Sequence, residues 1–501
     1  MQAGSHDVVI REAAVFDGHG NPPFIADVAI DDDRIADVGE ILGRGRSEID
    51  GQGLAVAPGF IDVHSHDDLA VFVAPQMDFK VMQGVTTDVV GNCGLGAAPY
   101  TVAIRAFAGL HTGIQLSPWE GYAGYFDAVD RDPPSLNIAA LAGHGTIREA
   151  AMGNQQRAPN AAELAVMRRY LDEAVNAGVV GFSTGLIYEP GRYAATDEII
   201  DLARQITGSG AIYTSHMRNE ADRLLDSIRE TIRIGAEARV PVQISHHKAS
   251  GRENWGKVNE SLHLIEQARS NGLDVTADQY PYTSGSTILA AVLQNDALNE
   301  RGRGGGIGIV AAHQVLLASA PRHPHYEGQT LEQLAQTFGL RAEAAAARIV
   351  AEEGNGALVV LETMDERDVR TVMRHPTTMI GSDGILGGSR PHPRLYGTFP
   401  RVIGYYAREQ GLMSIEEAIH RMTEMPAAKF AIKDRGIIRP GAYADLVVFN
   451  PTALIDTATY TDPCRYPAGI NHVFVNGRSV VKDACHTGAR PGRALRRPGS
   501  R

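Results

Sequence analysis

The chain has 501 residues and a formal net charge of −12, with 44% hydrophobic and 21% charged residues. This composition is typical of a folded globular protein and argues against a disordered chain. The acidic balance and the lack of a dense Lys/Arg tract argue against nucleic acid or an anionic membrane as the main partner. The length suits one barrel-sized domain of roughly 250 residues or more with added subdomains.

The cysteine pattern and the ends of the chain indicate a cellular location. Three cysteines form no CxxC pair and no even framework, which favours a reducing compartment. Met1 to His6 leads straight into an apolar strand without the features of an export signal, and no apolar run approaches the ~20 residues that span a bilayer. We therefore expect a cytoplasmic protein. The basic stretch at 489–501 is expected to be a solvated tail.

The two ends of the chain have the same kind of sequence pattern. Residues 7–57 and 435–482 consist of short β-type runs separated by Gly and Asp turns, with little helical period. We expect 1–57 and 435–501 to form one small β-domain, with the basic tail at the end of the second segment.

Between these ends, β-type runs alternate with helical stretches such as 161–178 and 220–239. This alternation predicts a (β/α)8 barrel over 58–434, and the lack of a G-x-G-x-x-G turn after the first run argues against a doubly wound sheet. The predicted strands are 58–66, 85–93, 137–145, 177–185, 211–217, 240–248, 273–282 and 377–383. Because the last connection is too long for one crossover, residues 287–370 are predicted to form an inserted subdomain, a candidate lid.

Six residues of the metal-ligand type lie at the C-terminal ends of these runs, where barrel enzymes place their catalytic residues. They are His64, His66, Cys93, His216, His246 and Asp383. In H-x-H the two imidazoles share one face of a strand, so one cation can contact both. A thiolate in GNCG suits zinc, although most free cysteines are simply small buried hydrophobic residues. The combination predicts a metal site at the barrel mouth.

Further polar residues near these strand ends are candidates for catalysis or substrate binding. Asp383, before a glycine, can cap a turn, or it can take the proton of a metal-activated water. On a strand, Lys248 would share the face of His246, while His247 would face away. A lysine and a guanidinium such as Arg394 both suit an anionic substrate group.

Two residues in GHGTIR, His144 and Arg148, also lie at a strand end. They can support the metal ligands or pack in the core, and the sequence leaves both roles open.

Several motifs resemble those of the N-acyl-D-amino-acid deacylases, or D-aminoacylases, of the amidohydrolase superfamily. They include PGFIDVHSHDD, GVTTDVVGNCG, GFSTGLIYEPGRYA, YTSHMR, ISHHKASG and GSDG, and the resemblance extends nearly end to end. The cysteine of GNCG is the most specific part. Related hydantoinases bridge two metals with a carbamylated lysine from the fourth strand. Here GVVGFSTGL has no lysine, so Cys93 looks like the substitute.

The resemblance implies an activity and a set of roles. The activity is zinc-dependent hydrolysis of small N-acyl-D-amino acids to a D-amino acid and a carboxylate. It implies tight zinc binding by Cys93, His216 and His246, with a second, weaker metal position near His64, His66 and Asp383. Asp383 would be the general base and acid. The substrate-carboxylate clamp would be Lys248, Tyr280, Ser286 and Arg394, with Tyr282 as the alternative to Tyr280.

Two other functions are weighed against this one. The first is another amidohydrolase, acting on a cyclic amide or a D-peptide, and a cyclic amidase would be expected to keep the fourth-strand lysine. The second is a non-catalytic zinc-binding scaffold, which would have no need of Asp383 or of a carboxylate clamp.

Overall fold

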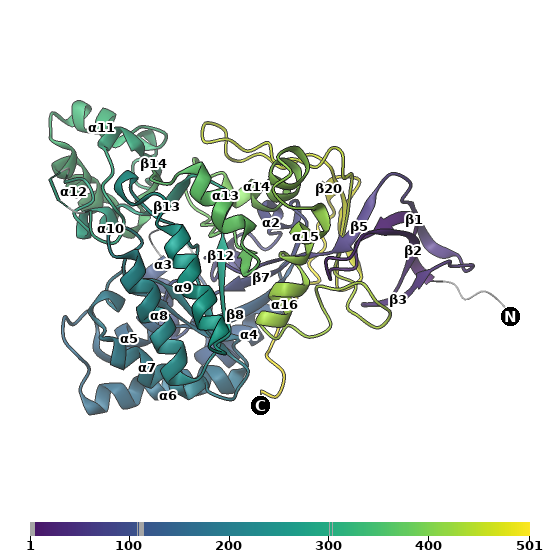
Figure 1. The fold of residues 1–501 in the computed structure, drawn as a ribbon, viewed down its shortest axis with the longest axis horizontal. Coiled ribbons are helices and arrows are strands. Elements are labelled where there is room, and N and C mark those ends of the chain that lie inside the picture. The colour runs from purple at the N-terminus through teal and green to yellow at the C-terminus, as the bar shows by residue number, and fades with distance from the viewer. Residues whose placement is uncertain (1–5, 108, 110–114, 300, 303, 501) are drawn as a thin grey trace.

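The computed structural model describes residues 6–107, 109, 115–299, 301, 302 and 304–500. Its centre is a parallel eight-stranded barrel, and the predicted (β/α)8 fold is confirmed because every strand lies within one of the predicted runs (Figure 1). The strands are β6 (Phe60–Asp62), β7 (Val85–Val90), β8 (Asn137–Gly143), β9 (Gly181–Gly185), β10 (Ile212–His216), β11 (Val242–Ile244), β12 (Val275–Gln279) and β16 (Thr378–Ile380). A parallel bridge between Ser65 and Gly384 joins the first and last strands just beyond their ends.

Helices connect the barrel strands, and both helices predicted from periodicity are present. In α6 (Ala161–Ala177), the Asn160 side chain accepts the Glu163 N–H, and the Glu163 carboxylate accepts the Asn160 N–H. This reciprocal cap begins the helix, and left-handed Gly178 ends it. The second predicted helix is α8 (Leu224–Ala238).

The remaining helices around the barrel come before, between or after its strands in the chain. They are α1 (Ala70–Val73), α2 (Asp78–Val81), α3 (Tyr100–Phe107), α4 (Gly121–Arg131), α5 (His144–Met152), α7 (Thr196–Ala203), α9 (Val258–Ser270), α13 (Glu366–Arg374), α14 (Arg394–Arg401), α15 (Ile415–His420) and α16 (Glu424–Lys429). A π-helical segment, Val402–Glu409, continues α14. Short 3₁₀ turns lie at Gly191–Tyr193, Arg204–Ile206, Arg252–Asn254, Ala312–Gln314, Pro324–Tyr326 and Gly354–Gly356.

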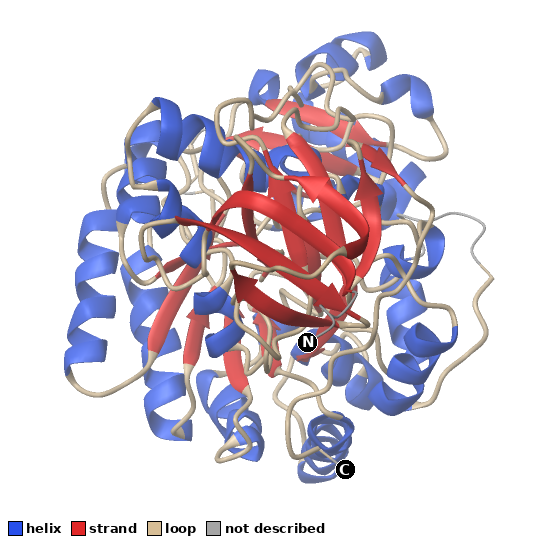
Figure 2. Ribbon diagram, turned by 90° about the vertical axis from the view of Figure 1, so that its right-hand side faces the viewer, coloured by secondary structure: helices blue, strands red, loops and turns tan. Residues whose placement is uncertain are grey.

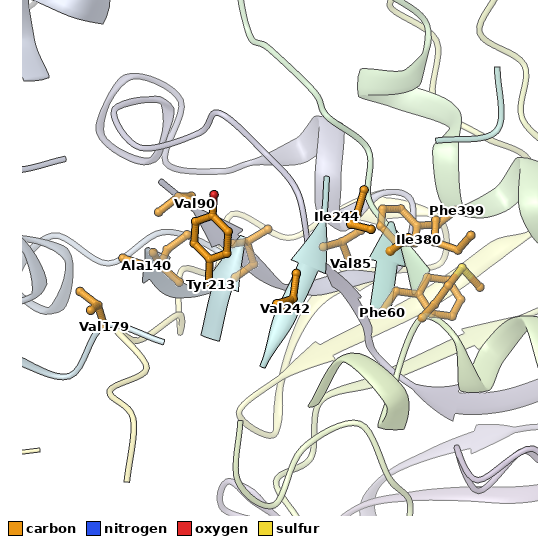
Figure 3. Close-up of a cluster of buried hydrophobic side chains, with 14 of the residues drawn as sticks. Phe60, Val85, Val90, Ala140, Val179, Tyr213, Val242, Ile244, Ile380 and Phe399 are labelled. Atoms are coloured by element: carbon orange, nitrogen blue, oxygen red, sulfur yellow. The ribbon is translucent and has the colours of Figure 1, made fainter. Parts of the chain in front are cut away.

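The barrel strands are buried on both faces. Val90 and Ala140 belong to the apolar cluster that includes the surrounding helices, whereas Val89 and Ala139 belong to a separate cluster with Phe430. Because successive side chains on a strand point in opposite directions, the two clusters are the outer and inner layers of the barrel. Figure 3 shows side chains of the outer layer from strands that are distant in the chain, among them Val90, Ala140, Tyr213 and Ile380.

Strands from both chain ends form one nine-stranded sheet beside the barrel (Figures 1 and 2). They are β1 (His6–Val15), β2 (Phe24–Asp31), β3 (Arg34–Gly39), β4 (Gly45–Asp50), β5 (Ala55–Pro58), β17 (Leu446–Phe449), β18 (Ile470–Val475), β19 (Arg478–Lys482) and β20 (Cys485–His486). The two ends meet where β5 pairs antiparallel with β17, with Val56 opposite Val448.

A second small sheet lies between β12 and β16 in the chain. It contains β13 (Ser284–Ile288), β14 (Val315–Ser319) and β15 (Leu358–Glu362), all antiparallel. With α10 (Leu289–Gln294), α11 (Leu331–Phe338) and α12 (Ala342–Glu353) it encloses its own apolar cluster. Figure 1 shows this inserted region at the opposite end of the molecule from β1 to β3. The domain boundaries given above stay a prediction.

The expectation of a solvated C-terminal tail is wrong for the described residues 489–500. The Leu495 N–H donates to the Ile138 carbonyl at 2.7 Å, so the tail pairs with β8. Arg496 lies 3.1 Å from the Asp127 carboxylate on α4. Arg490 and Arg493 likewise pair with Asp132 and Asp33, and composition alone does not show such partners.

Two expectations concern the membrane and the N-terminus. Among the described residues, no helix is both long and apolar enough to cross a bilayer. Of the segment Met1 to His6, only His6 lies within the described residues.

A buried lysine is the shared counter-ion of several carboxylates under the barrel mouth. Lys80 Nζ on α2 lies 2.5 Å from Asp62, 3.1 Å from Asp67 and 3.7 Å from Asp88, and all four side chains are fully buried. Burial alone would lower the pKa of Lys80, but these carboxylates, Asp62 first, raise it. Lys80 also donates to Ser382 Oγ at 3.0 Å. The ammonium thus links the first, second and last strand regions.

Replacing this lysine should destabilise the fold strongly. We expect Lys80→Met to lower the free energy of unfolding by about 3–5 kcal/mol, because buried carboxylates lose their counter-ion. Urea denaturation followed by circular dichroism measures this change. The matched control is Lys482→Met, at an exposed position, which should change stability by less than about 0.5 kcal/mol. Equal effects of both substitutions would contradict the role given to Lys80.

Candidate metal centre and active site

The candidate ligands converge at the C-terminal mouth of the barrel, each at or just past a strand end. Their ligand atoms form two groups that share one sulfur, and within each group the atoms lie within 4.8 Å of one another. The groups are His64, His66, Cys93 and Asp383, and Cys93, His216 and His246. All of these side chains are buried.

The thiol of Cys93 lies between the two groups. Its Sγ is 3.3 Å from His64 Nε2 and 3.6 Å from His246 Nε2. The His246 Nε2 atom is itself 2.8 Å from His216 Nδ1. Nitrogen and sulfur atoms at these separations face a common point from different strands, which is the arrangement that a metal site requires.

Three candidate ligands have a backbone conformation that is uncommon outside glycine. The φ angles of Cys93, His246 and Asp383 are 55°, 35° and 50°. Such conformations cost energy and persist where the surrounding structure enforces them, which happens often at functional sites. A glycine permits the close packing, because a Cβ on Gly185 would lie 2.0 Å from the Cys93 carbonyl oxygen.

The charges in this cluster fit a bound cation. Burial would raise the pKa of the Cys93 thiol, but the neighbouring imidazoles, His64 first, lower it well below its usual value. Burial would lower the pKa of His66, yet the Cys93 thiolate and Asp383 raise it to about 9. The buried anions are thus balanced by protons that a divalent cation would replace. One thiolate with several imidazoles is a donor set that suits Zn²⁺.

Two carboxylates that the sequence analysis missed orient the imidazoles. Asp278 Oδ1 lies 3.1 Å from His64 Nδ1 and accepts the His246 N–H at 2.7 Å. Glu220 Oε1 lies 2.9 Å from His246 Nδ1. Outer partners of this kind fix the ring orientation of metal ligands. Both carboxylates could have been found in the sequence, since Asp278 lies in the seventh strand run and Glu220 follows His216 by four residues.

As predicted, the two adjacent histidines point in different directions, with Lys248 on the side of His246. Strand alternation, however, is not the cause. Lys248 Nζ lies 2.9 Å from His246 Nδ1 and donates to Glu220 at 2.7 Å. His247 turns away, and its Nε2 lies 2.9 Å from Ser261 Oγ on α9. Strand β11 has already ended at this point, so the left-handed backbone of His246 sets these directions rather than strand alternation.

Arg394 is fully buried beside Asp383. Its Nη1 lies 3.0 Å from Asp383 Oδ2, its Cζ lies 4.4 Å from the Tyr280 ring centre, and its Nη2 donates to the Ser286 carbonyl at 3.3 Å. Within the described chain, Arg394 Nε makes no hydrogen bond. Burial would raise the pKa of Asp383, but Arg394 and His64 lower it well below its usual value. The guanidinium therefore keeps this carboxyl ionised and retains a free donor.

Three other candidates lie away from the ligand cluster. Tyr282 packs 4.9 Å from the Arg401 guanidinium, so Tyr280 is the tyrosine next to Arg394. His144 Nε2 and Arg148 Nε lie 3.0 Å and 3.1 Å from Glu198 Oε1, in a buried cluster that joins α5 to α7. None of their hydrogen bonds in the described chain reaches a candidate ligand, which favours the packing role.

Two cavities reach the ligand cluster. One, of about 330 Å³, opens onto His66 and Cys93. The other, of about 50 Å³, opens onto His216 and His246. Asp383 lines both, so the cavities meet at this carboxylate.

Comparison with known proteins places the chain in a family. The amidohydrolase family model matches residues 47–481. The D-aminoacylase of Alcaligenes xylosoxydans xylosoxydans is 39% identical over 498 residues, covering 98% of each chain. The N-acyl-D-glutamate deacylase of the same organism is 39% identical over 495 residues, covering 99% of this chain and 97% of its own.

A solved structure shows the same relationship. The N-acyl-D-glutamate deacylase from Bordetella bronchiseptica, complexed with zinc and a phosphonate inhibitor that mimics the tetrahedral intermediate, matches with a TM-score of 0.90 at 39% identity. The match covers 98% of this chain and 100% of that chain. Because these similarities extend over nearly the whole length, the chain belongs to the amidohydrolase family, in its branch of D-aminoacylases and N-acyl-D-amino-acid deacylases.

Proposed function

We propose that this protein is a zinc-dependent hydrolase that converts N-acyl-D-amino acids to a D-amino acid and a carboxylate. The observation that carries the proposal is the buried convergence of Cys93 with His216 and His246 beside Asp383, in a chain of this branch. The proposed tight zinc ligands are Cys93, His216 and His246, and the proposed second, weaker position is at His64, His66 and Asp383.

The side chains around the cluster have distinct proposed tasks. When bound, Zn²⁺ supplies a positive charge that polarises the acyl carbonyl and makes water acidic near neutral pH. The Asp383 carboxylate accepts the proton of the attacking water and then returns it to the departing amine. Arg394 keeps that carboxylate ionised between turnovers, which its 3.0 Å ion pair supports. Asp278 and Glu220 hold the imidazole rings in place.

The proposed clamp for the substrate carboxylate consists of Lys248, Tyr280, Ser286 and Arg394. The guanidinium of Arg394 is buried with a free Nε, and the ammonium of Lys248 lines the small cavity; both groups favour an anion nearby. Holding the α-carboxylate and the amide fixes two substituents of the chiral carbon. The side chain of only one enantiomer then enters the space that remains, so handedness follows from positioning.

The two rival functions have less support. Strand β9 reads GFSTG and has no lysine to carry a carbamate bridge, as a cyclic amidase would be expected to have. A scaffold would not account for two cavities that meet at an ionised aspartate. We also propose a cytoplasmic location, because Cys93, Cys464 and Cys485 are all unpaired, which favours a reducing compartment.

The direct test is release of free amine from a panel of N-acetyl-D- and N-acetyl-L-amino acids. We expect the D-enantiomers to react at least roughly 100-fold faster, as measured by kcat/KM, because only they satisfy the clamp and the metal together. Chelation should abolish activity and added zinc should restore it, with metal content followed by elemental analysis. Equal rates for both enantiomers, or hydrolysis of cyclic amides alone, would contradict the proposal.

The role of Asp383 can be separated from metal binding. We expect Asp383→Asn to lower kcat by about 10²- to 10⁴-fold, because the amide cannot take the proton, while the tight zinc stays bound. Steady-state kinetics and elemental analysis measure the two effects. The control is Asp483→Asn, at an exposed aspartate with a similar left-handed backbone, φ 49°, which should behave as the parent enzyme. A variant that keeps most of its kcat would remove Asp383 from this role.

The proposed role of Cys93 as a zinc ligand can be tested in the same way. We expect Cys93→Ser to weaken zinc binding by more than the roughly 10- to 100-fold loss that removal of an outer partner causes, because a direct ligand is lost. Zinc content after dialysis against a graded series of chelator concentrations gives the affinity. Cys464→Ser, at an exposed cysteine, is the control. Parent-like zinc retention in Cys93→Ser would show that the sulfur is not a ligand.

A further inference from the structure

The two cavities approach the ligand cluster from different sides. The small cavity is lined by Lys248 and Tyr280 of the proposed clamp, whereas the large cavity is lined by His66 and Cys93. Ser286 of the clamp lines both. Asp383 lines both, so a carbonyl that reacts beside this carboxylate lies at their junction. With the α-carboxylate held in the small cavity, the acyl group on the other side of the carbonyl has the large one to extend into.

The wall of the large cavity is mainly apolar. It is formed by the segment after β7 with α3, by α5, by the segment after β9, by the inserted region and by Ile385 after β16. Its apolar residues include Leu95, Val102, Ala106, Phe107, Ile288 and Leu358. Its volume of about 330 Å³ falls in the range of roughly 300–1,000 Å³ that is usual for sites of drug-sized ligands. An acetyl group would contact only a small part of such a wall.

Charged residues that line this cavity do not offer a free cation. Arg105, at the exposed edge of α3, is paired with Glu149 at 3.0 Å. An acidic acyl group would have to break this pair, whereas an aliphatic chain would leave it intact. The charge pattern therefore favours a neutral, apolar acyl group.

We propose that the large cavity is an acyl-binding site and that the preferred substrates are D-amino acids that carry an apolar acyl chain longer than acetyl. This inference rests on the proposed function and concerns the acyl half of the substrate, which the family relationship does not specify. The inserted region supplies Ile288 and Leu358 to the wall, so it takes part in acyl selection.

The first test uses the unmodified zinc enzyme and one D-amino acid acylated with acetyl, butanoyl, hexanoyl or octanoyl groups. Because burial of a methylene is favourable, kcat/KM should rise by about three- to four-fold for each methylene that enters the cavity. Hydrolysis of the acetyl compound with no rise along the series would overturn the acyl site and leave the proposed function standing. Failure to hydrolyse any member, in either enantiomer, would overturn both.

A second series separates the acyl group from the side chain. With acetyl held constant, D-amino acids with straight side chains of increasing length should show no comparable rise in kcat/KM. A rise with side-chain length and none with acyl length would assign the large cavity to the side chain, and the proposal would be wrong.

A matched pair of variants on α3 tests whether the large cavity causes the preference for long acyl chains. Ala106 lines the cavity, and Ala106→Phe should lower the octanoyl-to-acetyl ratio of kcat/KM by about ten-fold or more, because the ring fills apolar space. Thr101 is exposed on the same helix, and Thr101→Phe should leave the ratio unchanged. An unchanged ratio in a folded, zinc-bound Ala106→Phe enzyme would overturn the proposal. The chain-length series decides the question independently of how well this variant folds.

Discussion

The arrangement of this molecule depends on one buried thiolate placed between two sets of imidazoles. A desolvated anion is costly unless positive charge surrounds it, and the Cys93 sulfur has His64 and His246 within 3.6 Å. The barrel supplies this charge because its strands end around a common mouth. The same requirement explains the local backbone: the left-handed turn at Cys93 and the glycine at position 185 allow the sulfur to reach the centre without a steric clash.

Buried carboxylates connect this centre to the rest of the barrel. Asp278 contacts a histidine from each ligand group and also accepts from Gln243 Nε2 at 2.8 Å, so all its interactions are made inside the barrel. On the other side, Lys80 neutralises Asp62 and its neighbours just below the first ligand pair. These ionic contacts thus link the ends of several strands. A change at one strand end is therefore expected to alter ligand positions on others, because buried ionic groups tolerate little displacement.

Much of this could be predicted from the sequence because the signals are local. Apolar runs locate the eight strands, and residues at the ends of five of these runs are the ones that meet at the mouth. Pairings between distant segments are not visible in this way. Nothing in the run VTADQ shows that Asp278 contacts His64, which lies 214 residues earlier. Arg496 of the C-terminal tail is similar, since its acidic partner Asp127 belongs to α4.

The inserted region contributes both to the proposed carboxylate clamp and to the proposed acyl-binding wall. Strand β13 carries Ser286 and Thr287, which line both cavities, and Ile288, which lines only the large one. The Ser286 carbonyl also accepts from Arg394, so the strand that contacts the clamp continues directly into the proposed acyl wall. A shift of β13 against β15 would move both surfaces together, because antiparallel pairing holds the strand as one unit. Selection of the amino acid and of the acyl group are thus expected to change together, while the ligands on the barrel strands stay in place.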